Sequence, residues 1–141
     1  MLDFNSKFGR AIKKHLKNQY FVWLTTVDAK GAPQPRPVWF VWDGDSFLIF
    51  SQPNAYKVKH VKNNPKVSLH FNTTDNAGEK NVIVFNGQAS IDHQALPAHK
   101  LPAYMRKYKT GILGLNATPK EFSEEYSAAI RIKPTEVRGW V

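Results

Sequence analysis

Cysteine is absent from the 141 residues of this chain. Its absence excludes a disulfide framework, a thiolate nucleophile and a cysteine-ligated metal centre. The five histidines show neither the HxxxH nor the HExxH spacing of common metal sites, and no GxSxG nucleophile motif occurs. We therefore expect no metal ion in the protein, and the sequence indicates no catalytic triad of serine, histidine and aspartate.

Long apolar runs are also missing. No segment approaches the roughly 20 apolar residues that a membrane-spanning helix requires. The N-terminal stretch MLDFNSKFGRAIKKHLKN lacks the apolar segment and small-residue cleavage site of a signal peptide. We therefore expect a cytoplasmic protein with no membrane partner. The length fits one domain over residues 1–141, and a hydrophobic content of 42% can form a real core.

Acidic residues are scarce, with 11 Asp and Glu against 20 Lys and Arg, which gives a net charge of +9. Much positive charge is concentrated in FLIFSQPNAYKVKHVKNNPKVSLHF, residues 47–71. It could form a solvated helix face, a nucleic-acid patch or the seat of one phosphate. The apolar runs FLIF and SLHF lack the interleaved aromatic and basic residues of a nucleic-acid stacking platform. We therefore expect no nucleic-acid partner.

Hydrophobic periodicity predicts a mainly β fold with peripheral helices. An amphipathic helix is expected over residues 5–18, capped by Asn5 or Ser6, and a short helix over residues 54–62. Asn86-Gly87 suggests a bulge, residues 92–127 read as helices and loops, and Thr118 is a plausible helix cap. The strand at 20–27 reads as buried on both faces. Six strands in hairpin-like succession favour a closed or partly closed antiparallel barrel. The strands are expected at residues 20–27, 36–42, 46–51, 67–71, 82–91 and 128–141.

From about residue 20 to residue 91 the chain resembles the pyridoxamine 5'-phosphate oxidase-like split-barrel family, and the motif stands in residues 36–71, RPVWFVWDGDSFLIFSQPNAYKVKHVKNNPKVSLHF. The shared pattern is a strand led by Arg36, a hairpin, a strand ending at Ser51, Lys57 six residues later, and Asn-Pro-basic-Val-Ser-Leu at residues 64–69. The segments PVWFVWDGD and IRIKPTEVRGW are similar to the deazaflavin-using branch. The resemblance implies a six-stranded antiparallel split β-barrel that binds FMN. It also implies a homodimer with the cofactors at the subunit interface.

The resemblance further implies a cofactor site. Arg36 and Lys57 match the positions that hold the cofactor phosphate, and Ser51 matches a hydroxyl beside them. Asn81 matches a position where an amide contacts the ring or the ribityl chain. Independently, the expected helix start at residues 54–56 offers unpaired N–H groups and a positive dipole end to an anion. The candidate cofactor-binding residues are Arg36, Val38, Trp39, Ser51, Tyr56, Lys57 and Asn81.

The leading hypothesis is a flavoprotein, an FMN- or deazaflavin-dependent oxidoreductase that transfers a hydride to or from a small conjugated substrate. FMN is favoured and the deazaflavin coenzyme F-420 is the alternative. No catalytic side chain is assigned, because the cofactor carries the chemistry. Tyr56 stands where the true oxidases carry Arg, and Val41 where they carry Lys, which argues against vitamin B6 oxidation itself. The competing hypotheses are a non-catalytic flavin- or haem-binding split barrel and a nucleic-acid-binding barrel. Residues 92–127 have no assigned role, although such a segment could cover the cleft.

Overall fold

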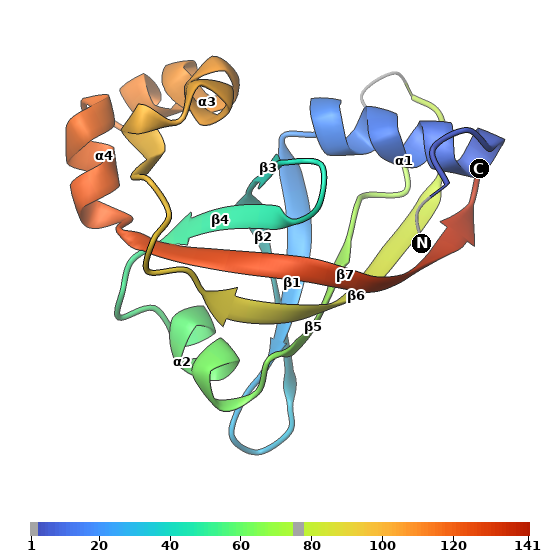
Figure 1. The fold of residues 1–141 in the computed structure, drawn as a ribbon, viewed down its shortest axis with the longest axis horizontal. Helices are drawn as coiled ribbons and strands as arrows, with labels where there is room; N and C mark the ends of the chain where they lie inside the picture. Colours follow the sequence, from blue (N-terminus) through green and yellow to red (C-terminus); the bar gives the residue numbers. More distant parts are fainter. Residues whose placement is uncertain (1–2, 75–77) are drawn as a thin grey trace.

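We analysed a computed structural model that describes residues 3–74 and 78–141. Within these residues one antiparallel sheet of seven strands curls into a half-barrel, in the order β2-β1-β5-β6-β7-β4-β3 (Figure 1). This confirms the expected mainly β split-barrel fold with peripheral helices. No described helix is long and apolar enough to cross a membrane. The elements are α1 (Lys7–Asn18), β1 (Phe21–Val27), β2 (Pro33–Trp39), β3 (Val41–Trp42), β4 (Phe47–Ser51), α2 (Tyr56–Asn63), β5 (Lys66–His70), β6 (Val82–Ile91), the 3-10 turn η1 (Ala98–Lys100), α3 (Pro102–Gly114), α4 (Pro119–Glu125) and β7 (Ala128–Trp140).

The strand count differs from the expected six because the strand expected at residues 36–42 is interrupted at Phe40. The backbone N–H of Phe40 donates to the Tyr108 hydroxyl at 2.8 Å, and its carbonyl accepts from that hydroxyl at 2.9 Å. Phe40 is thus held by α3 instead of a neighbouring strand. Before this residue β2 pairs with β1, and after it β3 pairs with β4. The interruption therefore carries the chain from one edge of the sheet to the other.

Strand β1 was expected to be buried on both faces, and this is wrong. Val22, Leu24 and Thr26 are buried against the barrel interior, whereas Trp23 is half-buried and Phe21 is 47% exposed. The alternation is that of a sheet with one face on the core and the other only partly covered. The outer face of β1 is therefore available for further contacts.

Strand β2 is an open edge of the sheet with a particular backbone chemistry. Pro33, Pro35 and Pro37 alternate along it, so their nitrogens lie on the same side of the strand. If the proline nitrogens pointed toward β1, three hydrogen-bond donors would be missing from the β1–β2 ladder. The nitrogens therefore face the open edge of the sheet. At these positions the edge offers carbonyl acceptors but no N–H donors, which disfavours pairing with a further strand.

Several local predictions are confirmed. Ser6 caps α1, since its hydroxyl accepts from the Gly9 N–H at 2.9 Å. Thr118 and Glu121 form a reciprocal capping box on α4. The register of β6 and β7 shifts between Asn86 and Gly87, as expected for a bulge. Within residues 92–127, the helices α3 and α4 lie together over the end of the sheet where β7 begins (Figure 1).

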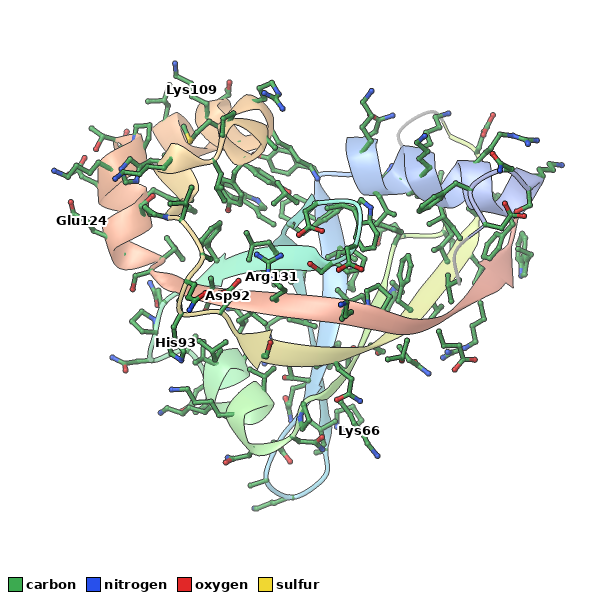
Figure 2. All side chains as sticks on the ribbon, in the orientation of Figure 1. Lys66, Asp92, His93, Lys109, Glu124 and Arg131 are labelled. Atoms are coloured by element: carbon green, nitrogen blue, oxygen red, sulfur yellow. The ribbon has the colours of Figure 1, made fainter. Side chains whose placement is uncertain are left out.

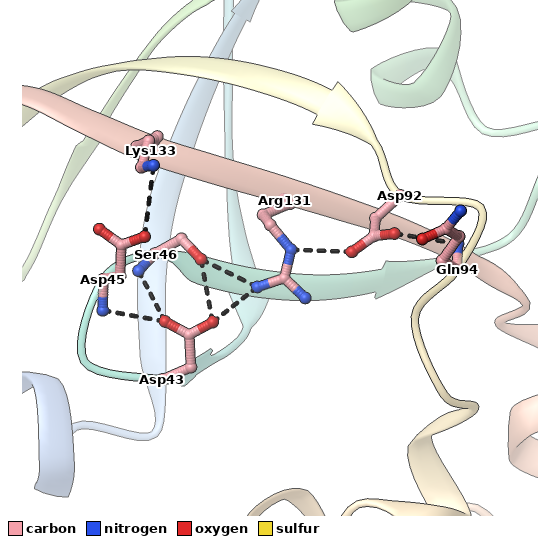
Figure 3. Close-up of polar contacts among 7 residues, drawn as sticks. All are labelled: Asp43, Asp45, Ser46, Asp92, Gln94, Arg131 and Lys133. Carbon is pink, nitrogen blue, oxygen red and sulfur yellow. Dashed lines mark hydrogen bonds and ion pairs between the residues drawn. The ribbon is translucent and has the colours of Figure 1, made fainter.

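A polar cluster ties the β3–β4 hairpin to the long strands β6 and β7 (Figure 3). Arg131 of β7 donates from Nε to Asp92 at 2.9 Å, and from an outer guanidinium nitrogen to Asp43 at 2.7 Å and to Ser46 at 2.9 Å. Figure 2 shows Arg131 and Asp92 side by side at the junction of the two strands. Lys133 pairs more loosely with Asp45, at 3.3 Å. Arg131 therefore clamps the turn of the β3–β4 hairpin to strand β7.

Candidate functional site

A cleft of about 220 Å³ lies between the β1–β2 edge, the start of α2, and the helices α3 and α4. Its walls are mainly aromatic and apolar, and Lys57 is the one cation among the residues that line it. A cleft of this kind suits a planar apolar ligand that carries a negative group. The lining residues are Phe21, Pro37, Val38, Trp39, Phe50, Lys57, Tyr104, Leu115, Phe122 and Tyr126.

The aromatic wall is held by close packing of α3 against the sheet. The Trp39 ring stacks on Tyr108 with centroids 4.7 Å apart and planes 10° apart, and it stacks on Phe122 at 5.7 Å. Gly111 permits this approach, because a Cβ there would lie 2.1 Å from the Tyr20 hydroxyl oxygen and 3.0 Å from the Trp39 ring. The indole of Trp39 is therefore fixed in orientation before any ligand arrives.

Two cations from different elements meet at the α2 end of this cleft. Arg36 pairs with Leu24, whose side chain is buried in the barrel core, so Arg36 also faces the barrel interior. Helix α2 seals that end of the barrel, where His60 contacts the Thr26 hydroxyl at 2.8 Å. Burial, and then the charge of Arg36, lower the pKa of Lys57. Arg36 and Lys57 therefore lie near enough for their charges to interact.

Arg36 also has a donor without a partner. Its Nε is buried and makes no hydrogen bond within the described part of the chain. A buried N–H that lacks an acceptor is unfavourable by about 1–3 kcal/mol. An anion placed between Arg36 and Lys57 would satisfy this donor and would also offset the repulsion between the two cations.

The other predicted site residues differ in position. Val38 and Trp39 line the cleft. Ser51 is fully buried, and its hydroxyl donates to the Gln52 carbonyl at 2.9 Å, so it must rotate to donate to a phosphate. Tyr56 is 70% exposed and stacks on His60 of its own helix, outside the residues that line the cleft.

Asn81 lies apart from the other candidates within one chain. Next to it, Val82 pairs with Trp140, whereas Ile91 at the opposite end of β6 pairs with Ile130 near the start of β7. Ser51 is at that opposite end, because it pairs with Ala128. A ten-residue strand spans roughly 33 Å. Asn81 is not among the residues that line the cleft within one chain.

Seven residues of the cleft were not among the candidates. Phe21, Pro37 and Phe50 were expected only as parts of strands. Residues 92–127 had no assigned place, and they supply the other four, Tyr104, Leu115, Phe122 and Tyr126. A signal was present in the spacing of Tyr104, Tyr108 and Ile112, which lie four residues apart and form the buried face of α3. None of the residues that line the cleft is a histidine. No group of three or more His, Asp or Glu suited to a metal ion occurs within residues 3–74 and 78–141.

A family model described as pyridoxamine 5'-phosphate oxidase matches residues 8–141. The pyridoxine/pyridoxamine 5'-phosphate oxidase of Vibrio vulnificus (strain YJ016) is 35% identical over 70 residues, which cover 49% of this chain and 33% of that protein. Oxidase 2 of Hydrogenovibrio crunogenus is 33% identical over 72 residues, or 50% of this chain and 34% of that protein. The match thus spans about a third of the length of these curated relatives.

Solved structures share the fold over most of the chain. An F420 reductase aligns with a TM-score of 0.68 at 20% identity, over 89% of this chain and 94% of that one. HutZ, a haem storage protein from Vibrio cholerae, aligns with a TM-score of 0.65 at 16% identity, over 94% of each chain. At these identities the likeness establishes the split-barrel fold alone, so the choice of ligand rests on the residues of the cleft.

Proposed function

This chain belongs to the pyridoxamine 5'-phosphate oxidase family, and we propose that it is an FMN-dependent oxidoreductase. The flavin lies in the aromatic cleft with its phosphate at Arg36 and Lys57. The substrate is a small conjugated molecule that exchanges a hydride with the flavin. The deazaflavin coenzyme F-420 is the alternative cofactor. We further propose a cytoplasmic homodimer with the cofactor between its subunits.

The observation that carries this proposal is the pairing of Arg36 with Lys57. Two cations approach one another in a partly buried place, and the Arg36 Nε has no acceptor within the described residues. Like charges arranged in this way favour a bound anion with several acceptor oxygens, and a phosphate has them. Lys57 lies in the first turn of α2, where unpaired backbone N–H groups add to the positive potential.

The remainder of the cleft suits an aromatic ring system. Trp39, Phe50 and Phe122 give it apolar walls, and the proline-rich edge of β2 supplies carbonyl acceptors beside them. A cleft of about 220 Å³ is below the roughly 300–1,000 Å³ of pockets that hold whole ligands. Phe21 at its rim is 47% exposed, so a second subunit seated on this face would enlarge and close the site.

A bound flavin supplies the hydride chemistry, and the side chains of this protein supply position and shielding. Trp39 and Phe122 exclude water from one part of the cleft, and Lys57 and Arg36 fix the phosphate end. No histidine, methionine or cysteine lines the cleft, so among the common axial ligands of haem iron it offers only tyrosine. The described residues of the cleft therefore favour a flavin over haem.

The test begins with the absorption and fluorescence spectra of freshly purified protein, which distinguish flavin, deazaflavin, haem and an empty cleft. Protein loaded with FMN is then mixed anaerobically with NADPH, and a quinone is added afterwards. We expect a flavin spectrum that bleaches with the donor and returns with the acceptor. A haem spectrum, or failure of the apo protein to take up FMN or the deazaflavin, would contradict the proposal.

A further inference from the structure

A second cavity of about 330 Å³ lies on the opposite flank of α3, between α1, β3 and α3. It shares no lining residue with the aromatic cleft. Three of its residues are cations from two helices, and none of its residues is acidic. The lining residues are Leu16, Lys17, Asn18, Val41, Trp42, Ala103, Arg106 and Lys107.

Within residues 3–74 and 78–141, no ion pair joins the cations of this cavity to a carboxylate. The acidic residues nearest in sequence to Trp42 are Asp43 and Asp45, and these pair with Arg131 and Lys133. Figure 3 shows both carboxylates turned toward β7. Lys17, Arg106 and Lys107 therefore share a concave surface without a counter-ion among its lining residues.

Lys107 is the most unusual of the three cations. Its ammonium donates to the Phe40 carbonyl at 3.0 Å and lies 3.6 Å from the centre of the Phe40 ring. The Tyr108 ring is 5.3 Å away. Burial lowers the pKa of Lys107 to about 8. A half-buried ammonium without an ion pair is a position at which a bound anion gains both charge attraction and a hydrogen bond.

The other half of the cavity is apolar. Leu16 is buried, and Val41 and Trp42 are half-buried beside it. A compact inorganic ion would leave these walls in contact with water, whereas a ligand with an apolar body would cover them. The indole of Trp42 also offers a flat surface to a planar group.

We propose that this cavity binds a small organic carboxylate with a planar apolar body. The carboxylate is held by Lys107, Arg106 and Lys17, and the apolar body lies against Trp42 and Val41. The site is separate from the flavin cleft, so its occupation does not depend on the proposed oxidoreductase function.

The test uses benzoate as the probe and the four tryptophan indole N–H signals as the readout in a two-dimensional NMR titration. The signal lost in Trp42→Phe identifies Trp42. We expect benzoate to move the Trp42 signal and to leave Trp23 and Trp140 in place. Neutral benzamide should bind at least tenfold more weakly than benzoate, and sulfate should do the same because it lacks the apolar body. Equal binding of benzamide, or shifts of all four signals alike, would overturn the proposal.

Charge variants locate the carboxylate. Lys107→Met keeps the apolar stem, and Tyr108 still donates to the Phe40 carbonyl, so the fold should persist, as a thermal melt would confirm. We expect this variant to weaken benzoate binding about tenfold or more, and Arg106→Ala by about threefold. Lys109→Ala is the matched control, since Lys109 is exposed on the same helix outside the cavity (Figure 2). Unchanged binding in Lys107→Met would refute the site.

The pH dependence gives an independent readout. Neither benzoate nor sulfate titrates between pH 7 and 9, whereas Lys107 loses its proton there. The other groups that face it are the cations Lys17 and Arg106 and the hydroxyl of Tyr108, and burial raises the pKa of Tyr108. With a pKa of about 8, the charged fraction of Lys107 falls about tenfold between pH 7 and 9. Benzoate affinity should fall by a similar factor in the native protein and stay level in Lys107→Met. A level profile in both proteins would contradict the role of Lys107.

Discussion

The guanidinium of Arg36 on β2 lies close enough to the ammonium of Lys57 on α2 to add to the effect of burial and lower the pKa of that lysine. The pair is formed by tertiary structure, because one residue faces the barrel interior and the other begins the helix that seals it. Such a pair is unfavourable without an anion between its members. It therefore identifies the phosphate end of the proposed site.

Among the lysines of α2, Lys57 should make a much larger contribution to FMN binding than its neighbours. One charge-assisted bond to a phosphate corresponds to about ten- to a hundredfold in affinity. Lys57→Ala should weaken FMN binding by that factor. The affinity is measured through the quenching of flavin fluorescence on binding. Lys59→Ala and Lys62→Ala remove exposed charges on the same helix and should stay within about twofold. Similar small effects in all three variants would mean that the helix is only a solvated face.

Gly111 should be required for the packing of α3. Gly111→Ala places a methyl group 2.1 Å from the Tyr20 hydroxyl oxygen, and Trp39 closes the other side. We expect a loss of about 1–3 kcal/mol in the free energy of unfolding, measured with urea, because α3 must shift. The matched control is Gly114→Ala at the end of the same helix, where a Cβ meets nothing within 4 Å. The control should be neutral or slightly stabilising, and an equal loss in both variants would contradict this account.

The clamp around Arg131 should give the stability an acid dependence. The hydrogen bond from Arg131 is the main cause that lowers the pKa of Asp92. Because the folded pKa is below the unfolded value, the contribution is complete above about pH 4 and is lost as the pH falls through the folded pKa. Asp92→Asn should cost roughly 1 kcal/mol in urea unfolding at pH 7 and nothing below the folded pKa.

Asp45→Asn is the control for the clamp, since its pair with Lys133 joins side chains that are both more than 60% exposed. Such an exposed pair contributes little. A loss at pH 7 as large as that of Asp92→Asn would show that general surface charge, and not the Arg131 clamp, stabilises the hairpin.

The outer face of the β1–β2 edge should carry the subunit contact. We expect light scattering to give a dimer at micromolar concentration. Phe21→Glu should shift the equilibrium from dimer toward monomer and weaken FMN binding, because Phe21 lines the cleft and is 47% exposed. Leu96→Glu alters a residue that is 54% exposed and does not line the cleft, so it should remain dimeric. A native protein that is monomeric would contradict the proposed site between two subunits.

The sequence predicted those features that depend on local chemistry. The caps at Ser6 and Thr118 and the bulge at Asn86 follow from side chains close in the chain. The interruption at Phe40 could not be predicted in this way, because its partner Tyr108 is 68 positions away.

The candidate site was predictable to a similar extent. The resemblance named Arg36 and Lys57, and the fold brings them together. The sequence suggested that residues 92–127 could cover the cleft, but it did not name the residues of that wall, because helical spacing identifies a buried face without stating what it covers. Asn81 shows the opposite case. It matches a cofactor-contacting position of the family in the sequence, but in the fold it lies at the end of β6 that is far from Ile91.

The most direct test compares FMN with riboflavin, which has the same ring system and no phosphate. Affinities for both ligands are measured by fluorescence titration in the native protein, Lys57→Ala, Arg36→Ala and the double variant. We predict that the native protein prefers FMN by at least about tenfold, and that either single change removes most of this preference. The double variant should add little, since both groups hold one phosphate. Equal affinities of the native protein for FMN and riboflavin would contradict the assignment of Arg36 and Lys57 as the phosphate site.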